Sequence, residues 1–129
     1  MSHVMQVRVY YEDTDMGGIV YYANYLRYIE RGRSELVEEL GLNQRDMKDR
    51  DGIVFVVTRV VADYLGAARL DDRLTVVTKH RPQGAVRWVF EQEVRRGVEV
   101  LFRAEVTVVC MTTEGRPTRL PAELRRQVH

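Results

Sequence analysis

Cysteine is almost absent from this 129-residue chain, and proline, tryptophan and histidine are scarce. The single Cys110 cannot form an internal disulfide, and its apolar surroundings predict a buried, unreactive thiol. Long hydrophobic runs are also missing, because the longest, residues 53–57, is far shorter than the roughly 20 residues that span a bilayer. The first residues lack the basic-then-apolar order of a signal peptide, so we expect a cytoplasmic protein.

The sequence also lacks the motifs of metal, nucleotide and nucleic-acid sites. His3, His80 and His129 share no metal-ligand spacing, so no metal is expected. The glycines form neither a dinucleotide fingerprint nor a phosphate-binding loop. The formal net charge is +1, and no basic patch is interleaved with aromatic residues, which argues against a nucleic-acid partner. Composition therefore indicates an ordinary globular protein that carries no nucleic acid and no metal.

What is present is the pattern of one helix and several strands. Apolar residues three and four apart predict a helix over residues 23–40, and Gly41 follows as its stop. Alternating apolar residues predict strands, and one of these segments is apolar almost throughout, as expected of a strand buried on both faces. The predicted strands are residues 4–11, 53–62 (the apolar one), 74–80, 86–94 and 98–111, with turns at residues 81–84 and 96–97 and a surface tail from residue 113.

The last predicted strand constrains the shape of the fold. Fully extended, it would measure roughly 45 Å at about 3.3 Å per residue, whereas a compact domain of this size is about 36 Å across. The sheet must therefore curve, and the single helix is what it can curve around. Gly32 in the middle of that helix predicts a close approach to the sheet. We predict one α+β domain over residues 1–129, with a mostly antiparallel sheet.

Apolar residues remain that one helix cannot cover. Val77, Val89, Leu101 and Val109 are predicted to point to the sheet face away from the helix, and residues 53–61 carry further apolar side chains. An apolar surface of this extent usually marks an interface. We therefore expect a homodimer or a larger assembly.

The candidate site lies in residues 11–26, where Asp13 and Asp15 precede a glycine pair and the predicted helix. This order would place a carboxylate beside unbonded backbone N–H groups at a helix N-terminus, where developing negative charge is stabilised. Such a site could break an acyl bond without a metal. The simpler alternative is that Asp15 only forms an Asx turn before Gly17. Asn24 is predicted to be the N-cap of the helix.

Three stretches, residues 10–26, 63–72 and 106–121, resemble the hotdog-fold acyl-CoA thioesterases, with Asp-Thr-Asp-Met-Gly-Gly-Ile-Val-Tyr as the most specific block. The chain looks most similar to the 4-hydroxybenzoyl-CoA thioesterase type and, within it, to the Tol-Pal-associated acyl-CoA thioesterases. The resemblance covers nearly the whole sequence. It implies a curved five-stranded antiparallel sheet around a central helix, dimers that join two sheets side by side, and active sites at the subunit boundary.

The resemblance also implies two catalytic roles. The family's catalytic carboxylate falls on Asp15, and the backbone N–H that polarises the thioester carbonyl falls on Tyr22. Asp15 could attack the thioester carbon or act as general base on a water, and the sequence leaves both routes open. One departure concerns Tyr22, because the Tol-Pal-associated members usually carry His there, whereas the 4-hydroxybenzoyl-CoA enzyme carries an aromatic residue.

Candidate substrate contacts lie in the same block and on later strands. Gly18 would either only provide a turn or let a thioester approach the backbone closely. Tyr22 and Tyr25 would either belong to the core at helical spacing or line the acyl pocket. Guanidinium groups would bind the phosphates of coenzyme A, which is part of the substrate, so no separate cofactor is expected. The complete set is Gly18, Ile19, Val20, Tyr25, Arg59, Arg81 and Arg87.

The predicted function is hydrolysis of an acyl-CoA thioester to a free acid and coenzyme A. Two alternatives stay open at this point. One is a thioesterase whose partner is an acyl carrier protein, and the other is a non-catalytic acyl-carrier or envelope-complex binding protein. The expected assembly is a homodimer or a homotetramer of two dimers.

Overall fold

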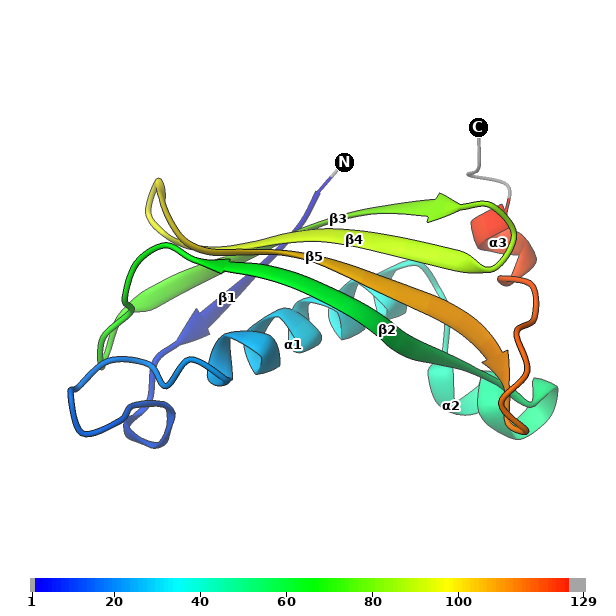
Figure 1. Ribbon diagram of the computed structural model, residues 1–129, viewed down its shortest axis with the longest axis horizontal. Coiled ribbons are helices and arrows are strands. Elements are labelled where there is room, and N and C mark those ends of the chain that lie inside the picture. The colour runs from blue at the N-terminus through cyan, green and yellow to red at the C-terminus, as the bar shows by residue number, and fades with distance from the viewer. Residues whose placement is uncertain (1, 126–129) are drawn as a thin grey trace.

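The computed structural model describes residues 2–125, which form a five-stranded antiparallel sheet with one long helix against one face (Figure 1). The strands lie side by side in the order β1-β3-β4-β5-β2. Their bounds are β1 His3–Arg8, β2 Ile53–Tyr64, β3 Arg73–Gln83, β4 Arg87–Arg96 and β5 Glu99–Thr112. The long helix is α1, Asn24–Glu39, and short helical turns are η1 Tyr11–Asp13, α2 Gln44–Asp46, η2 Met47–Asp51 and α3 Ala122–Arg125. The predicted α+β architecture is confirmed.

The sheet curves around α1, as the length of the last strand predicted (Figure 1). Pairing between β2 and β5 shifts between Val57 and Arg59, and pairing between β4 and β5 shifts between Val94 and Arg95. Such irregularities bend a strand and increase its twist. The 14-residue β5 therefore follows the helix instead of running straight.

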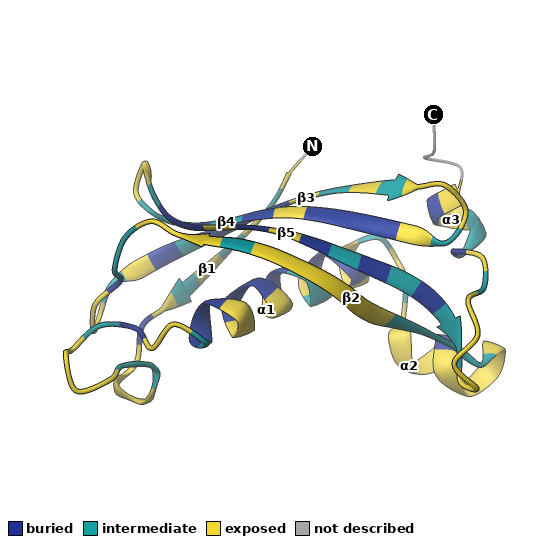
Figure 2. Cartoon of the chain, in the orientation of Figure 1, coloured by how far each residue is buried: buried dark blue, intermediate teal, exposed yellow. Residues whose placement is uncertain are grey.

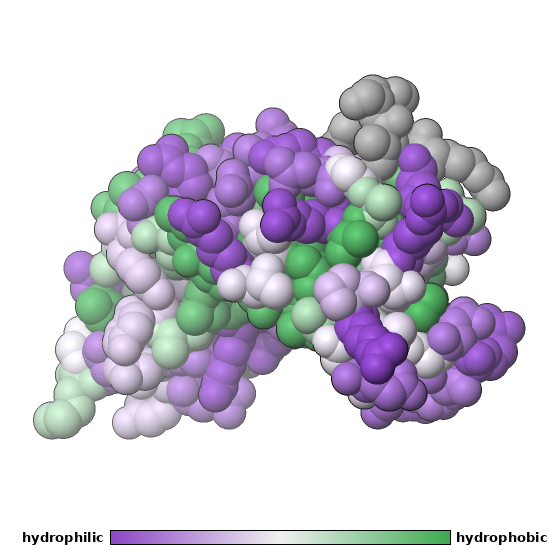
Figure 3. Space-filling view, turned by 45° about the vertical axis from the view of Figure 1, so that its right-hand side comes forward, coloured by the Kyte–Doolittle hydropathy of each residue, from purple (hydrophilic) through white to green (hydrophobic). Residues whose placement is uncertain are grey.

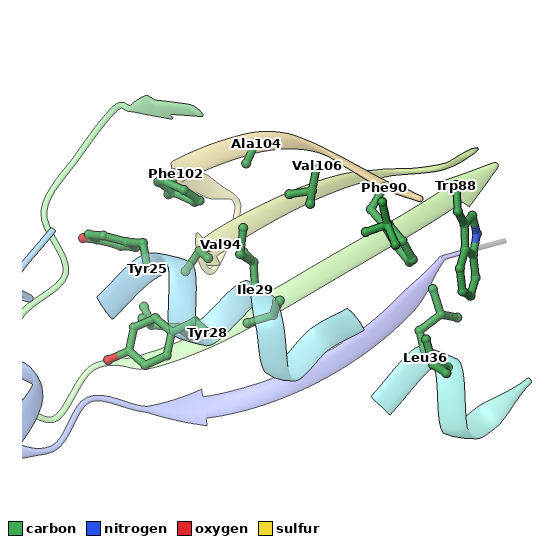
Figure 4. Packing of buried hydrophobic residues seen from close by; sticks show 14 of the residues in the cluster. Tyr25, Tyr28, Ile29, Leu36, Trp88, Phe90, Val94, Phe102, Ala104 and Val106 are labelled. Atoms are coloured by element: carbon green, nitrogen blue, oxygen red, sulfur yellow. The ribbon is translucent and has the colours of Figure 1, made fainter. Parts of the chain in front are cut away.

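The hydrophobic core fills the space between α1 and the concave face of the sheet. Figure 4 shows helix side chains pointing toward the aromatic residues of β4 and β5, and Figure 2 shows the buried residues concentrated on α1 and the central strands. The core-facing positions of β4 and β5 are the even-numbered ones, as predicted. Trp88, Phe90, Val94, Phe102 and Val106 are each at most 1% exposed.

Gly32 brings α1 into close contact with the sheet. A Cβ atom there would lie 2.8 Å from Cγ1 of Val76 and 3.0 Å from Oγ1 of Thr78. Beside it, the buried Gln92 amide donates to the Ile29 carbonyl at 2.8 Å and to Thr78 Oγ1 at 2.9 Å. The absence of a side chain at Gly32 thus lets helix and sheet approach closely enough for Gln92 to bond both, as the sequence predicted.

Two strands differ from their predictions. The first strand ends at Arg8 instead of residue 11, because the chain turns into η1, where the Asp13 carboxylate accepts a 2.9 Å hydrogen bond from the Tyr10 N–H. Strand β2 is an edge strand, so the prediction that it is buried on both faces is wrong for a single chain. Its side chains Val57 and Val61 are 45% and 47% exposed.

The far face of the sheet is exposed and apolar mainly along β2, where Val56 and Val61 are 37% and 47% exposed. Val77, Val89 and Leu101 are at most 8% exposed. Exposed valines gather instead on the β2 edge, and Figure 3 shows hydrophobic side chains on the face that carries β2. The exposed apolar surface of the sheet is therefore concentrated at the β2 edge.

The turns and the tail are also shifted from their predicted places. The β3–β4 turn lies at residues 84–86 and the β4–β5 turn at residues 97–98, each later than predicted. The tail does not simply run over the surface, because Leu120 and Leu124 are buried. The Leu120 N–H donates to the Ala85 carbonyl at 2.7 Å, which fastens the tail to the β3–β4 turn.

Replacing Gly32 with Ala should destabilise the protein, although Ala is the better helix former by about 1 kcal/mol. The added methyl group would meet the rigid, buried side chain of Val76, and overpacking of this kind costs about 1–3 kcal/mol. Urea denaturation of Gly32→Ala measures the loss. Glu35→Ala on the exposed side of the same helix is the control, with an expected change within about 0.5 kcal/mol. Equal stability of the two variants would contradict the close approach.

Candidate active site

Residues 14–20 form a tight loop directly before helix α1. Thr14 and Val20 pair as an isolated antiparallel bridge that closes the loop. Inside it, the Asp15 N–H donates to the Ile19 carbonyl at 2.9 Å, and the Gly18 N–H donates to the Asp15 carbonyl at 3.0 Å. Gly18 has φ +75°, a left-handed conformation that suits glycine. The glycine pair therefore lets the chain reverse within a few residues.

The Asp15 side chain is exposed on this loop. Its Oδ1 accepts a 2.8 Å hydrogen bond from the Gly17 N–H, so the Asx turn is present. Its other oxygen, Oδ2, has no hydrogen-bond partner among residues 2–125. Asp15 lines an open hollow of about 580 Å³ together with Tyr11, Thr14, Met16, Gly18 and Leu70. The turn thus orients the carboxylate and leaves one oxygen available.

Helix α1 begins beside this loop with unbonded N–H groups. The N–H groups of Asn24, Tyr25 and Leu26 donate to the carbonyls of residues 21, 22 and 23 at 2.8–3.3 Å. Those of Tyr22 and Ala23 have no partner in the part of the chain that the structure describes. The helix dipole adds partial positive charge at this end. Two donors are therefore available to an oxygen that gains negative charge.

One carbonyl, that of Asp13, joins the loop to the helix. It accepts the Tyr21 N–H at 2.9 Å and the side-chain amide of Asn24 at 2.8 Å. The prediction that Asn24 is the N-cap is therefore wrong, because the cap position falls on Ala23, which makes no side-chain cap bond. Asn24 is instead the first helical residue, and its side chain points back to the loop.

A second loop, residues 66–72, supports the site from the other side. Ile19 pairs with Arg69 as an isolated bridge, and the Val20 N–H donates to the Ala68 carbonyl at 2.9 Å. The Asp72 carboxylate accepts hydrogen bonds from the Arg69 N–H at 2.9 Å and the Arg96 guanidinium at 2.8 Å. Burial alone would raise the pKa of Asp72, but these bonds lower it overall. Sequence reasoning gave these residues no role, since only the fold brings them to the site.

Tyr22 and Tyr25 have different environments. Tyr22 is 60% exposed, so its predicted place in the core is wrong, and its ring lies 5.9 Å from that of Tyr64. Tyr25 is buried and stacks on Phe102 at 5.2 Å. Its hydroxyl accepts the Ala68 N–H at 3.0 Å and donates to the Gly66 carbonyl at 3.4 Å, and burial raises its pKa. Tyr25 therefore ties the helix to the second loop.

The chain matches known proteins over nearly its whole length. The sequence profile of the thioesterase-like superfamily matches residues 9–128. The chain belongs to this superfamily. The acyl-CoA thioesterase YbgC of Haemophilus influenzae is 39% identical over 124 residues, which cover 95% of this chain and 91% of that protein. This finding confirms the resemblance to the hotdog-fold thioesterases.

Solved structures of thioesterases share the fold. A probable thioesterase from Bartonella henselae has a TM-score of 0.89 at 35% identity, covering 94% of this chain and 100% of the other. An aspartate-to-asparagine mutant of 4-hydroxybenzoyl CoA thioesterase, complexed with 4-hydroxybenzoyl CoA, has a TM-score of 0.88 at 25% identity and covers 99% of both chains. This thioesterase-like chain thus has the hotdog fold.

In a single copy of the chain, the residues predicted to contact the substrate do not all lie near Asp15. Gly18 lies at the hollow, Ile19 is half-buried, and Val20 is 3% exposed, so Val20 can offer only its backbone. Arg59 and Arg81 lie in one row across the sheet, through the cross-strand partners Thr107 and Val89. This row alternates with the core-facing residues and so lies on the face away from α1.

The arginine Arg87 lies on the same face, because its pairing partner is Val109 in β5. Arg81 is paired with Glu91 at 3.1 Å, whereas Arg59 and Arg87 form no ion pair within residues 2–125. Contact of these three residues with coenzyme A stays a prediction. Within a single chain they are separated from Asp15 by the sheet.

Groups suited to other chemistries do not gather at this site. Within residues 2–125 no three His, Cys, Asp or Glu side chains are grouped to hold a metal. The His80 Nδ1 accepts a 3.0 Å hydrogen bond from the Trp88 indole, and burial lowers its pKa. Burial raises the pKa of the Cys110 thiol to about 11, so it stays protonated at neutral pH. None of the helices in these residues is long and apolar enough to cross a membrane.

Removing the Tyr25 hydroxyl should destabilise this thioesterase-like fold by about 1–3 kcal/mol, because Tyr25→Phe leaves the Ala68 N–H unpaired. Tyr28 provides a matched control on the same helix. Its buried hydroxyl has no hydrogen-bond partner within residues 2–125, so Tyr28→Phe should change stability by less than about 0.5 kcal/mol or increase it. Urea denaturation of both variants checks the pair. Equal losses would contradict the assigned role of the Tyr25 hydroxyl.

Proposed function

We propose that this protein hydrolyses acyl-CoA thioesters to a free acid and coenzyme A. One observation carries the proposal: the unbonded oxygen of Asp15 lies on a loop that adjoins the unbonded N–H groups of Tyr22 and Ala23. A negatively charged oxygen and a pair of N–H donors are what acyl transfer requires. Membership of the thioesterase-like superfamily and the 39% identical Haemophilus influenzae relative support the choice of a thioester as the bond that is broken.

The N–H of Tyr22 is the proposed donor to the thioester carbonyl oxygen. Negative charge develops on that oxygen when a nucleophile adds to the carbonyl carbon, and the helix N-terminus stabilises it. A single backbone donor of this kind lowers the barrier by roughly 3–4 kcal/mol. The side chain of Tyr22 takes no part in this step, so Tyr in place of His is compatible with it.

Asp15 supplies the attack in one of two ways. As nucleophile, its oxygen bonds to the thioester carbon, the carbon–sulfur bond breaks, and the coenzyme A thiolate leaves. Water then opens the resulting mixed anhydride and restores the carboxylate. As general base, Asp15 instead takes a proton from a water that attacks the same carbon. In both routes the products are the acid and the thiol of coenzyme A, and no further cofactor takes part.

The proposed assembly is a homodimer, or a homotetramer of two dimers, formed through the β2 edge. Val56, Val57, Val60 and Val61 on this strand are 37–47% exposed. Edge strands present unpaired backbone groups that can pair with another chain. Because Arg59, Arg81 and Arg87 lie across the sheet from Asp15 in one chain, we assign phosphate binding to arginines of a neighbouring copy.

Replacing Asp15 with Asn should lower kcat by roughly 100-fold to 10,000-fold, because the amide is neither a nucleophile nor a base. Thiol release from acyl-CoA substrates of different chain length and from aromatic acyl-CoA substrates measures it. The control is Glu12→Gln, an exposed neighbour in η1, which should keep the wild-type rate. Wild-type turnover by Asp15→Asn would remove this residue from the mechanism. A wild-type protein that hydrolyses only carrier-linked thioesters would favour the acyl-carrier-protein function.

A charge placed on the β2 edge should dissociate the proposed dimer. Val60→Lys puts a cation within the apolar edge, whereas Val98→Lys makes the same change at the fully exposed β4–β5 turn. Sedimentation equilibrium should give a dimer or tetramer for wild type and Val98→Lys, and a monomer for Val60→Lys. A monomeric wild-type protein at micromolar concentration would refute the assembly and the assignment of phosphate binding to a neighbouring copy.

A further inference from the structure

The side chain of Asn24 is a buried polar group with a single, short hydrogen bond to the loop. It is 8% exposed, and its Nδ2 donates to the Asp13 carbonyl at 2.8 Å. It does not cap the helix, because Ala23 occupies that position. Burying an amide costs free energy unless it is hydrogen-bonded, so its single bond should be maintained in the folded protein.

This bond lies where the two halves of the candidate site meet. The Asp13 carbonyl precedes Asp15 by two residues, and it also accepts the N–H of Tyr21, the neighbour of Tyr22. The Asp13 carbonyl oxygen therefore connects the start of the loop, which carries the Asp15 carboxylate, to the start of α1, which carries the free N–H groups. Neither of the two donors to this oxygen touches the hollow where Asp15 lies.

We propose that Asn24 is a positioning residue, whose amide holds the Asp15 loop at the separation from the Tyr22 N–H that attack on a thioester needs. The inference rests on the proposed function. With the amide removed, the Asp13 carbonyl keeps only the Tyr21 N–H as a donor, while Ile19 and Val20 hold the other end of the loop to residues 68 and 69, so the segment around Asp13 and Asp15 can shift. A displacement of about 1 Å in a reacting group can reduce a rate by roughly 100-fold.

The variant Asn24→Asp removes the side-chain N–H donor of residue 24 and keeps almost the same side-chain shape. An ionised carboxylate cannot donate to the Asp13 carbonyl and repels its oxygen. We expect kcat to fall by roughly 10-fold to 100-fold at pH 8, with KM changed by less than about threefold, because the variant alters geometry and not substrate contacts.

Lowering the pH should partly restore the activity of Asn24→Asp. As pH falls, the introduced carboxyl takes up a proton and can again donate, so the ratio of its kcat to that of wild type should rise. Every other ionisable group near the site is present in wild type as well, so its effect cancels in the ratio. Structural damage alone would leave the ratio low at every pH.

Two further variants complete the activity test. Asn24→Ser keeps a shorter donor and should retain more activity than Asn24→Ala. Asn43→Asp makes the same chemical change at the exposed N-cap of α2, where a carboxylate can still accept the Asp46 N–H, and should behave as wild type at all pH values. If Asn24→Ala fails to fold, the pH dependence of Asn24→Asp decides. Wild-type kcat in Asn24→Asp at pH 8 would overturn the proposal.

Amide hydrogen exchange separates this inference from the proposed function. In Asn24→Asp, the segment that contains the Tyr21 N–H should exchange faster than in wild type, whereas exchange in β4 should stay unchanged. This readout needs no turnover. A wild type without thioesterase activity would therefore refute the proposed function, and unchanged exchange near Tyr21 would refute positioning by Asn24.

Discussion

The candidate site depends on the carbonyl oxygen of Asp13, which accepts one hydrogen bond from the Tyr21 backbone and one from the Asn24 side chain. These bonds set where the loop of Asp15 stands relative to the first turn of α1. The other contacts near the site hold either the helix or the Asp15 loop in place. Gly32 fixes the helix by allowing contact with β3, and the bonds of Ala68 to Val20 and Tyr25 fix the loop against the rest of the chain.

Periodicity predicted the elements because it reports which side chains face the core. Helix α1 was expected over residues 23–40 and spans Asn24–Glu39, and the even-numbered residues of β4 and β5 face it as expected. Periodicity failed at β2, because an apolar strand at a sheet edge has the same pattern as one in the middle. It could not foresee that Asp13 would end β1 early by bonding the Tyr10 N–H.

The site was predictable only in part, for the same reason. Asp15 and the helix start are neighbours in sequence, so their proximity follows from local order and from the glycine pair. The contribution of residues 66–72 is tertiary, since Ala68 lies in the loop between β2 and β3, far along the chain from Val20. Asn24 was assigned to the cap because Asn is favoured there, whereas the Asp13 carbonyl offers it a half-buried acceptor that no sequence pattern reveals.

A single chain leaves the candidate site open on one side. The Asp15 loop, the Tyr22 and Tyr64 rings and the valines of β2 are all exposed. One molecule thus has exposed apolar side chains at the start of α1 and along the β2 edge. Its phosphate-binding candidates, Arg59 and Arg87, lie on the sheet face away from α1. A second copy that covers the edge would explain why these features occur together.

The most direct test is a crystal structure of the Asp15→Asn protein with an uncleaved acyl-CoA. The account predicts that the thioester carbonyl oxygen lies about 3 Å from the Tyr22 N–H, with the carbonyl carbon facing residue 15. A thioester bound away from the start of α1, with its carbonyl oxygen held by other groups, would contradict it.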